Sequence, residues 1–90
     1  MVTIIIPGPI RAYTGGQRSV DVSGNTVGDA LESLVSLYPG IRPHIYDEHG
    51  ILFPSIHIFL KDQDVSNLQS ENTPINNGDR LIMATAISGG

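Results

Sequence analysis

Residues 26–38 read Thr-Val-Gly-Asp-Ala-Leu-Glu-Ser-Leu-Val-Ser-Leu-Tyr, and they predict the one main helix against which the rest of the chain packs. The apolar residues recur at the three-, four- and seven-residue spacings of one helical face; they are Val27, Ala30, Leu31, Leu34 and Tyr38. Thr26 stands where a helix N-cap is expected, with Asp29 in the reciprocal capping-box position. Pro39-Gly40 then ends the helix after about three turns, and residues 41–46 predict one more short helical turn.

A β-hairpin is predicted before this helix. Residues 1–6 are β-branched and apolar, which indicates a strand buried on at least one face. Pro7-Gly8-Pro9 ends that strand, because proline lacks the backbone donor that a sheet requires. After a turn signal at residues 14–17, the alternation of Ser19–Val22 predicts a second strand with Val20 and Val22 pointing inward.

The chain after the helix predicts further strands. Residues 55–60 alternate, so that Ile56, Ile58 and Leu60 share one face. Residues 61–64 predict a polar turn, and residues 65–68 (Val-Ser-Asn-Leu) a short edge strand. Residues 69–77 predict a loop, after which Arg80–Thr85 forms the last strand.

These elements predict an α+β fold. A helix of three turns covers only one face of a sheet, so we place it across one face of a mixed four- or five-stranded sheet. The first and last strands are the most apolar and should be central neighbours. They would run parallel, because the helix and the later strands supply the crossover between them. This arrangement is the β-grasp, or ubiquitin-like, fold.

Length and composition restrict the class of protein. The 90 residues suit a single domain, residues 1–90, with a flexible tail at residues 86–90. The absence of cysteine excludes disulfides, thiolate metal sites and cysteine nucleophiles. A net charge of −4 argues against nucleic acid as a partner. No basic leader and no apolar run of about 20 residues is visible, so we expect no membrane partner and a cytoplasmic location.

The chain ends in Ile87-Ser88-Gly89-Gly90. Glycine has no β-carbon, so a Gly-Gly end suits a terminus that must thread into a narrow active site of another protein. The reacting group would then be the carboxylate of Gly90, with Ile87, Ser88 and Gly89 as the threading segment. Composition alone produces two terminal glycines roughly once in eighty chains, and chain termini are often small and without function.

The body of the chain carries no recognisable catalytic group. His44, His49 and His57 match no metal-ligand spacing, so we expect no metal and no bound cofactor. Asp47 and Glu48 are adjacent in a turn and are interpreted as solvated.

Strand alternation predicts a partner-binding surface on the sheet face opposite the helix. Its predicted residues are Ile5, His57, Phe59 and Ile82, since several apolar groups on an open sheet face indicate a partner. There are two alternatives: these residues are ordinary exposed side chains without a partner, or they pack inward because the alternation of a strand is misread by one residue.

The chain resembles the ubiquitin-like sulfur-carrier family (MoaD/ThiS type). The resemblance rests on Pro7-Gly8-Pro9-Ile10-Arg11 with Thr14-Gly15-Gly16-Gln17, on the helix that begins at Thr26, on Tyr38-Pro39-Gly40, and on Asn77-Gly78-Asp79 with Gly89-Gly90. It implies a protein that is not itself an enzyme. A ubiquitin-activating-enzyme-like partner would use ATP to adenylate Gly90, and a sulfur source would convert it to a thiocarboxylate.

The resemblance does not identify the protein that accepts the sulfur. The segment around Arg11 and residues 14–17 looks most like the cysteine-synthesis carriers, which implies a cysteine-synthase-like acceptor. The large subunit of molybdopterin synthase is close behind, although molybdopterin-type carriers often have proline where Thr85-Ala86-Ile87 stands here. A protein modifier joined through Gly90 to lysines, and a β-grasp interaction module with an inert tail, are the alternatives from other classes.

Overall fold

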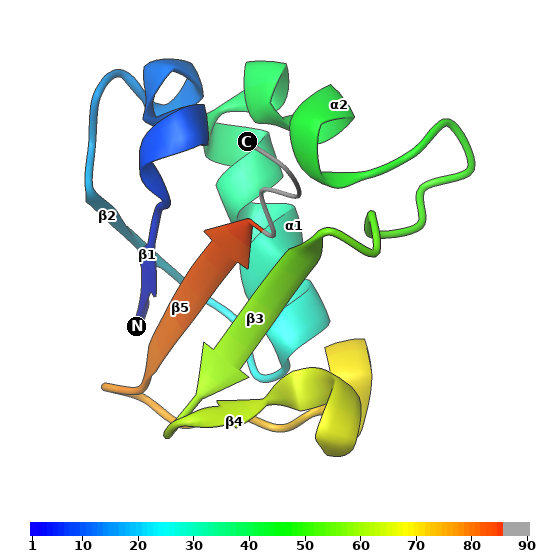
Figure 1. Ribbon diagram of the computed structural model, residues 1–90. Coiled ribbons are helices and arrows are strands. Elements are labelled where there is room, and N and C mark those ends of the chain that lie inside the picture. Colours follow the sequence, from blue (N-terminus) through cyan, green and yellow to red (C-terminus); the bar gives the residue numbers. More distant parts are fainter. Residues whose placement is uncertain (86–90) are drawn as a thin grey trace.

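The computed structural model describes residues 1–85, which form a five-stranded mixed sheet in the order β2-β1-β5-β3-β4 beside one main helix (Figure 1). The strands are β1 (Val2–Ile5), β2 (Ser19–Val22), β3 (Ile56–Leu60), β4 (Gln63–Asp64) and β5 (Arg80–Thr85). β1 and β5 are parallel, and the other neighbouring pairs are antiparallel. The first and last strands are therefore the central neighbours, which confirms the predicted β-grasp arrangement.

The main helix, α1 (Val27–Leu37), begins and ends as its sequence predicts. The hydroxyl oxygen of Thr26 accepts a hydrogen bond from the backbone N–H of Asp29 at 3.1 Å. The Asp29 carboxylate accepts in return from the N–H of Asn25, at 3.2 Å, one residue before the expected donor. Four residues of the predicted apolar face are buried, namely Val27, Ala30, Leu31 and Leu34, and Val35 joins them. Tyr38, the fifth, is the C-cap and is only half-buried. A short helix, α2 (Arg42–Ile45), follows the 3-10 turn η2 (Pro39–Ile41).

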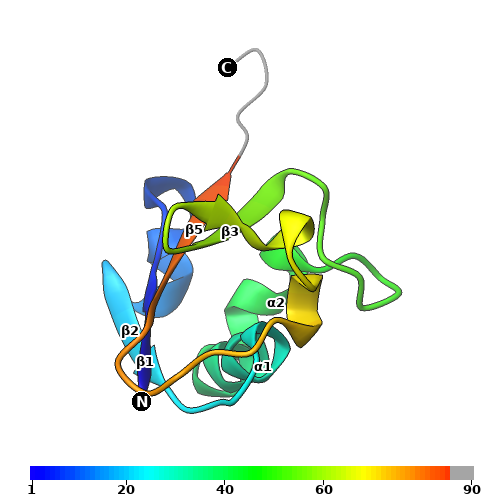
Figure 2. The same cartoon turned by 90° about the horizontal axis from the view of Figure 1, so that it is seen from below.

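The core lies between α1 and one face of the sheet. Figure 2 shows α1 and α2 on the same side of the strands. Alternate strand residues point to that side and are buried; they are Val2, Ile4, Val20, Val22, Ile56, Ile58, Leu60, Leu81 and Met83. The intervening strand residues are half-buried or exposed, so the second face of the sheet is the more accessible one. Within residues 1–85, no helix has the length and apolar character needed to cross a membrane.

The predicted edge strand at residues 65–68 is wrong. Val65–Asn67 form a 3-10 helix, η3, and the edge strand is β4, two residues earlier. The predicted polar turn shrinks to Lys61 and Asp62, whose φ values of +52° and +68° fit the left-handed geometry of a two-residue hairpin. The strand stops because the Asp64 carboxylate accepts a hydrogen bond from the N–H of Ser66 at 2.9 Å, which turns the chain into η3.

Two segments predicted as loops contain helical turns. Residues 8–14 form the 3-10 helix η1 (Gly8–Thr14), which buries Ile10 and Thr14. Residues 69–77 contain η4 (Ser70–Asn72), and Thr73 and Ile75 after it are buried. Polar composition concealed these contributions to the core, because only isolated side chains in each segment point inward.

Candidate functional site: an open sheet face on the C-terminal strand

Three of the four residues predicted to bind a partner lie in one row across the central strands. Ile82 of β5 is paired with Ile5 of β1 on one side and with Phe59 of β3 on the other. Side chains directly opposite each other on neighbouring strands lie within contact range. Ile82 is 43% exposed, whereas Leu81 and Met83 beside it are buried. The prediction of which strand residues face the helix and which face the open side of the sheet is therefore confirmed for these residues.

The fourth predicted residue, His57 of β3, lies on the same face, opposite the C-terminal end of β5. It pairs with Ala84, and its ring centroid lies 6.5 Å from that of Phe59. Its Nδ1 atom lies 3.0 Å from Oδ2 of Asp64, on the edge strand. This contact fixes the imidazole beside the apolar row and leaves Nε2 as its other polar atom.

Asp64 is a residue that sequence reasoning missed, because it was assigned to a turn. The pKa of its carboxyl group is lowered, chiefly by the hydrogen bond from the backbone N–H of Ser66 and further by His57. The available signal was the aspartate itself, because Asp side chains commonly accept a hydrogen bond from the backbone N–H two residues further on.

Polar residues border the apolar row. Two residues toward the start of β1 and β5 from Ile5 and Ile82, Thr3 is paired with Asp21 on β2 and with Arg80 on β5. The Thr3 hydroxyl donates a hydrogen bond to the Asp21 carboxylate at 2.7 Å. An apolar patch with a polar rim is the usual composition of a protein-binding surface.

The strand that precedes the C-terminal residues, β5, is paired on both sides. β5 is hydrogen-bonded between β1 and β3, and Thr85, its last residue, is paired with Ile56. The predicted reacting residue Gly90 and the threading residues Ile87, Ser88 and Gly89 lie outside the described residues. The strand that leads to them is the strand that carries Ile82.

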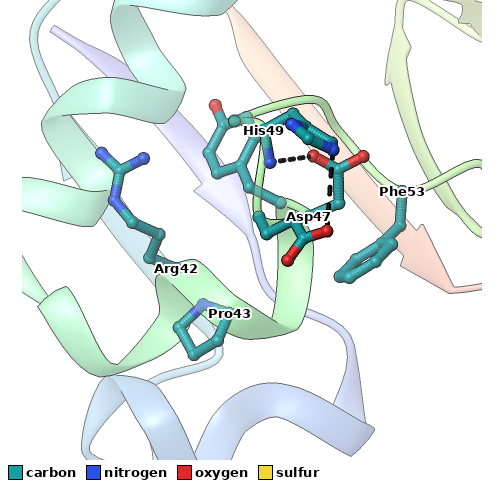
Figure 3. A pocket seen from close by; sticks show the side chains of 8 residues that line it. Arg42, Pro43, Asp47, His49 and Phe53 are labelled. Atoms are coloured by element: carbon teal, nitrogen blue, oxygen red, sulfur yellow. Dashed lines mark hydrogen bonds and ion pairs between the residues drawn. The ribbon is translucent and has the colours of Figure 1, made fainter.

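A broad pocket of about 870 Å³ lies elsewhere, between α2 and the loop that follows it (Figure 3). The guanidinium of Arg42 lies 5.5 Å from the ring centroid of Tyr46 and 3.2 Å from the Glu32 carboxylate. Burial and the nearby Glu71 carboxylate raise the pKa of Tyr46 to about 12, so its hydroxyl stays protonated at neutral pH.

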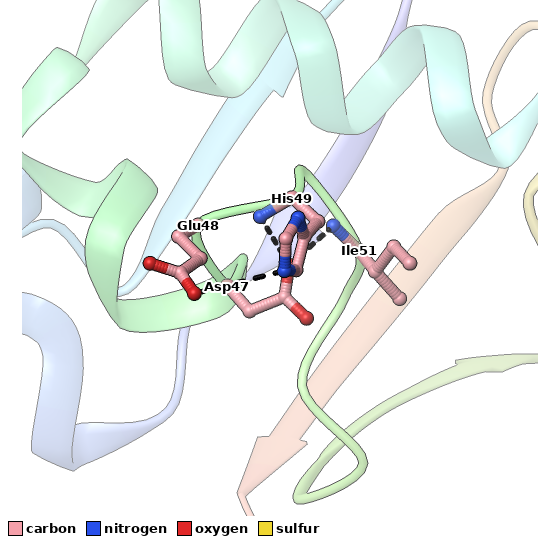
Figure 4. Close-up of polar contacts among 4 residues, drawn as sticks. All are labelled: Asp47, Glu48, His49 and Ile51. Carbon is pink, nitrogen blue, oxygen red and sulfur yellow. Dashed lines mark hydrogen bonds and ion pairs between the residues drawn. The ribbon is translucent and has the colours of Figure 1, made fainter.

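Asp47 has a structural role at this pocket. Its Oδ1 accepts hydrogen bonds from the backbone N–H groups of His49 at 2.8 Å and Ile51 at 3.0 Å, which closes the turn (Figure 4). Glu48 is highly exposed and lies 3.6 Å from His49. Both residues lie in a turn as predicted, and Glu48 is solvated, whereas Asp47 is half-buried and bound to the backbone of the turn.

The three histidines are dispersed. His44 stacks on Tyr13 with ring centroids 3.8 Å apart, His49 lies in the exposed turn, and His57 lies on the sheet face. In the part of the chain that the structure describes, no three His, Cys, Asp or Glu side chains are grouped so that they could hold a metal.

The chain is similar to known proteins in sequence and in fold. The model of the ThiS family matches residues 4–90. The sulfur carrier protein CysO of Mycobacterium tuberculosis is 36% identical over 91 residues, which cover 99% of this chain and 98% of that protein. Small archaeal modifier protein 1 of Haloferax volcanii is 33% identical over 82 residues, or 88% of this chain and 90% of that protein. A chain of the Amycolatopsis orientalis BexX/CysO complex superposes with a TM-score of 0.90 at 31% identity, with 100% of both chains covered.

Proposed function

The chain belongs to the ThiS family, and on that premise we propose that it is a sulfur carrier whose C-terminal Gly90 is converted to a thiocarboxylate. One observation carries the proposal. The strand that holds Ile82 at the centre of the open apolar row is also the strand that continues into residues 86–90. We expect a partner that covers the row to reach Gly90 as well, because residues 86–90 directly follow this strand in the sequence.

The first step activates Gly90. Its carboxylate is a poor electrophile, because resonance and negative charge disfavour nucleophilic attack. An adenylating partner lets a carboxylate oxygen attack the α-phosphorus of ATP, which releases pyrophosphate and forms an acyl-adenylate. ATP is thus a substrate of the partner, and this chain supplies no cofactor.

The second step installs sulfur. Sulfide attacks the acyl carbon and displaces AMP, which leaves a thiocarboxylate at Gly90. With a persulfide donor, the attack gives an acyl disulfide, which a thiol must then reduce. The thiocarboxylate is ionised at neutral pH and is a good nucleophile.

The third step delivers sulfur to an acceptor enzyme. Ile87 and Ser88 act as a spacer, and Gly89 allows the end to enter a narrow channel because it has no side chain. A cysteine-synthase-like acceptor is favoured by the likeness around Arg11 and by the 36% identity to a protein named CysO. The large subunit of molybdopterin synthase is the second choice.

Intact-mass measurement tests the proposal. Protein from its native host, or protein incubated with its activating enzyme, ATP and sulfide, should contain a form heavier by the difference between one sulfur and one oxygen atom. A variant lacking Gly90 should never acquire that mass. If the heavier form is absent from the full chain while the enzyme consumes ATP, the sulfur-carrier function is wrong.

A protein modifier is the second candidate, because the chain is also 33% identical to a small archaeal modifier protein. Attack of a lysine amine on the Gly90 acyl-adenylate would form an amide and release AMP. Adducts that survive boiling and reducing agent, and that require Gly90, would establish this function.

A further inference from the structure

The strand β2 forms one edge of the sheet that residues 1–85 build, and Figure 2 shows it at the margin of the molecule. The N–H of Ile6 donates to the carbonyl of Arg18 at 2.8 Å, so Arg18 turns its carbonyl toward β1. In an antiparallel ladder, the backbone groups of alternate residues point to the same side. Val20 therefore also faces β1, whereas the N–H and C=O groups of Ser19 and Asp21 point outward.

The outer edge of β2 is open to solvent. Ser19 and Asp21 are both exposed, whereas the alternate residues of the strand are buried on the helix side of the sheet. The open stretch ends at Ser23, whose carbonyl accepts a hydrogen bond from the Ser33 hydroxyl of α1 at 2.7 Å. Exposed and unpaired backbone groups on an edge strand are a template for a further strand. Two outward-facing residues of β2 are thus available for pairing.

A pocket of about 410 Å³ lies against this edge. Its apolar surface includes Leu37, which is 58% exposed, and Met1, which is 67% exposed and whose amino group is hydrogen-bonded to the side chain of Asn77. An extended segment beside β2 would point alternate side chains toward this pocket. The lining comes from the first residue, from the end of β2 and from α1; its residues are Met1, Asp21, Val22, Ser23, Glu32, Ser33, Ser36 and Leu37.

The charge of the pocket favours a cation. The Oδ1 atom of Asp21 accepts a hydrogen bond from the Thr3 hydroxyl at 2.7 Å, which leaves Oδ2 as the second acceptor of this carboxylate. The other acidic lining residue, Glu32, is ion-paired with Arg42 at 3.2 Å. No lysine or arginine is among the residues that line this pocket. A basic side chain placed opposite Asp21 would be attracted, and an acidic one repelled.

We propose that the outer edge of β2 binds an extended segment of a partner protein as an added strand, in which one lysine or arginine lies between two apolar residues. The added strand would exchange backbone hydrogen bonds with Asp21 and pair with Ser19, as in other complexes formed by strand addition. Directly paired side chains lie on the same face, so the basic residue would lie beside the Asp21 carboxylate. Its two apolar neighbours would point to the other face, beside Val20 and Val22, and enter the pocket next to Leu37.

A second copy of this chain fits the same edge poorly, because the residue between Val20 and Val22 is itself an aspartate. The proposal does not depend on chemistry at the C-terminus, since it concerns an edge of the sheet and not the strand β5.

A blocked peptide, acetyl-Thr-Val-Lys-Val-Thr-amide, is a direct probe of this edge. Titrated at millimolar concentration into the isotope-labelled full chain, it should shift the amide resonances of Ser19 and Asp21 and slow their hydrogen exchange. The matched peptide with Glu in place of Lys should bind several-fold more weakly. Equal binding of the two peptides, the absence of shifts, or shifts confined to β3 would overturn the proposal.

Two N-methylated forms of the lysine peptide test the backbone pairing separately from the charge. Methylation of the lysine nitrogen in the backbone removes the N–H that would face β2, so this peptide should lose its binding. Methylation of the following valine removes an N–H that would point away from β2, and this peptide should keep most of its affinity. Equal effects of the two methyl groups would show that the peptide does not bind as an added strand.

Variants of the chain complete the test. Asp21→Asn should weaken binding of the lysine peptide about two- to fivefold, the range of an exposed ion pair. Asp62→Asn makes the same charge change in the turn between β3 and β4 and should leave binding unaltered. Unchanged binding in Asp21→Asn would contradict the assigned charge contact. Broadening of the Ser19 and Asp21 resonances with protein concentration, together with a dimer in ultracentrifugation, would show that a second copy covers the edge and would overturn the proposal.

Discussion

The Nδ1 atom of His57 lies 3.0 Å from Oδ2 of Asp64, and this contact ties the centre of the open sheet face to its edge strand. The other oxygen of the same carboxylate accepts the N–H of Ser66 at 2.9 Å and starts η3. One side chain therefore orients the imidazole and turns the chain away from β3. The accessible face and the edge strand β4 share this single anchor.

Replacing Asp64 with alanine should destabilise the protein by about 1 kcal/mol, the typical cost of losing a capping side chain. Asp64→Asn keeps an acceptor for the Ser66 N–H and should cost less. Urea unfolding at pH 7 measures both. Equal losses for the alanine and asparagine variants would mean that the cap is not the cause.

The same interaction predicts a pH dependence. The pKa of Asp64 is lower in the folded chain than in the unfolded chain, so its ionised form stabilises the fold. That stabilisation is complete above the unfolded aspartate pKa of about 3.9 and is lost as the pH falls through the lower folded value. The difference in unfolding free energy between wild type and Asp64→Asn should therefore shrink on acidification from pH 5 to pH 2. A difference that grows over this range would contradict the assignment.

Ile82→Lys should disrupt docking of the activating enzyme without unfolding the chain. Ile82 is 43% exposed, so little core packing is lost. A charge at the centre of an apolar interface costs about 2 kcal/mol or more, or roughly thirtyfold in affinity. Ile51→Lys, at a side chain exposed by 62% on the loop after α2, is the matched control. Calorimetric titration with the enzyme should separate the two variants; equal affinities would remove the open face from the docking surface.

Gly89→Val should slow sulfur transfer while leaving the melting temperature unchanged. A β-branched side chain restricts the backbone and fills the space that a narrow channel leaves for glycine. Thiocarboxylate formation followed by mass spectrometry should fall by about tenfold or more, equivalent to about 1.4 kcal/mol in the barrier. Ser88→Ala changes the neighbouring residue conservatively and should retain most of the rate.

Gly24→Ala should destabilise the fold by about 1–3 kcal/mol, the usual cost of overpacking. A β-carbon at Gly24 would lie 2.8 Å from the backbone nitrogen of Ala30 and 2.8 Å from Cβ of Asp29, at the start of α1. Gly40→Ala meets no atom within 4 Å and is the control. Thermal unfolding should show a clear loss for Gly24→Ala alone.

Most regular elements were predictable because each carries a local periodicity. The helix at Val27–Leu37, the strands Ser19–Val22 and Arg80–Thr85, and the inward side of β3 all follow from spacing and turn residues. The assignment of Ile5, His57, Phe59 and Ile82 to one face also followed from alternation, although the binding role of that face stays a prediction.

The edge of the sheet was not predictable in the same way. β4 is only two residues long, and its end depends on the contacts of Asp64 with His57 and Ser66. The sequence offered Val65 as a strand residue, whereas in the folded chain it is buried at the start of η3. Short segments have too few residues for a period to show, so tertiary contacts determine their conformation.

The sequence by itself determined the elements, their inward faces and the glycine pair at residues 89–90, because these depend on local spacing and on residue type. Only the tertiary structure decided that Ile82 lies between Ile5 and Phe59, and that Asp64 lies beside His57. Register between strands that are distant in sequence is set by how their side chains pack together against α1. No local sequence pattern encodes that packing, because the residues that pair across the strands lie dozens of positions apart in the sequence.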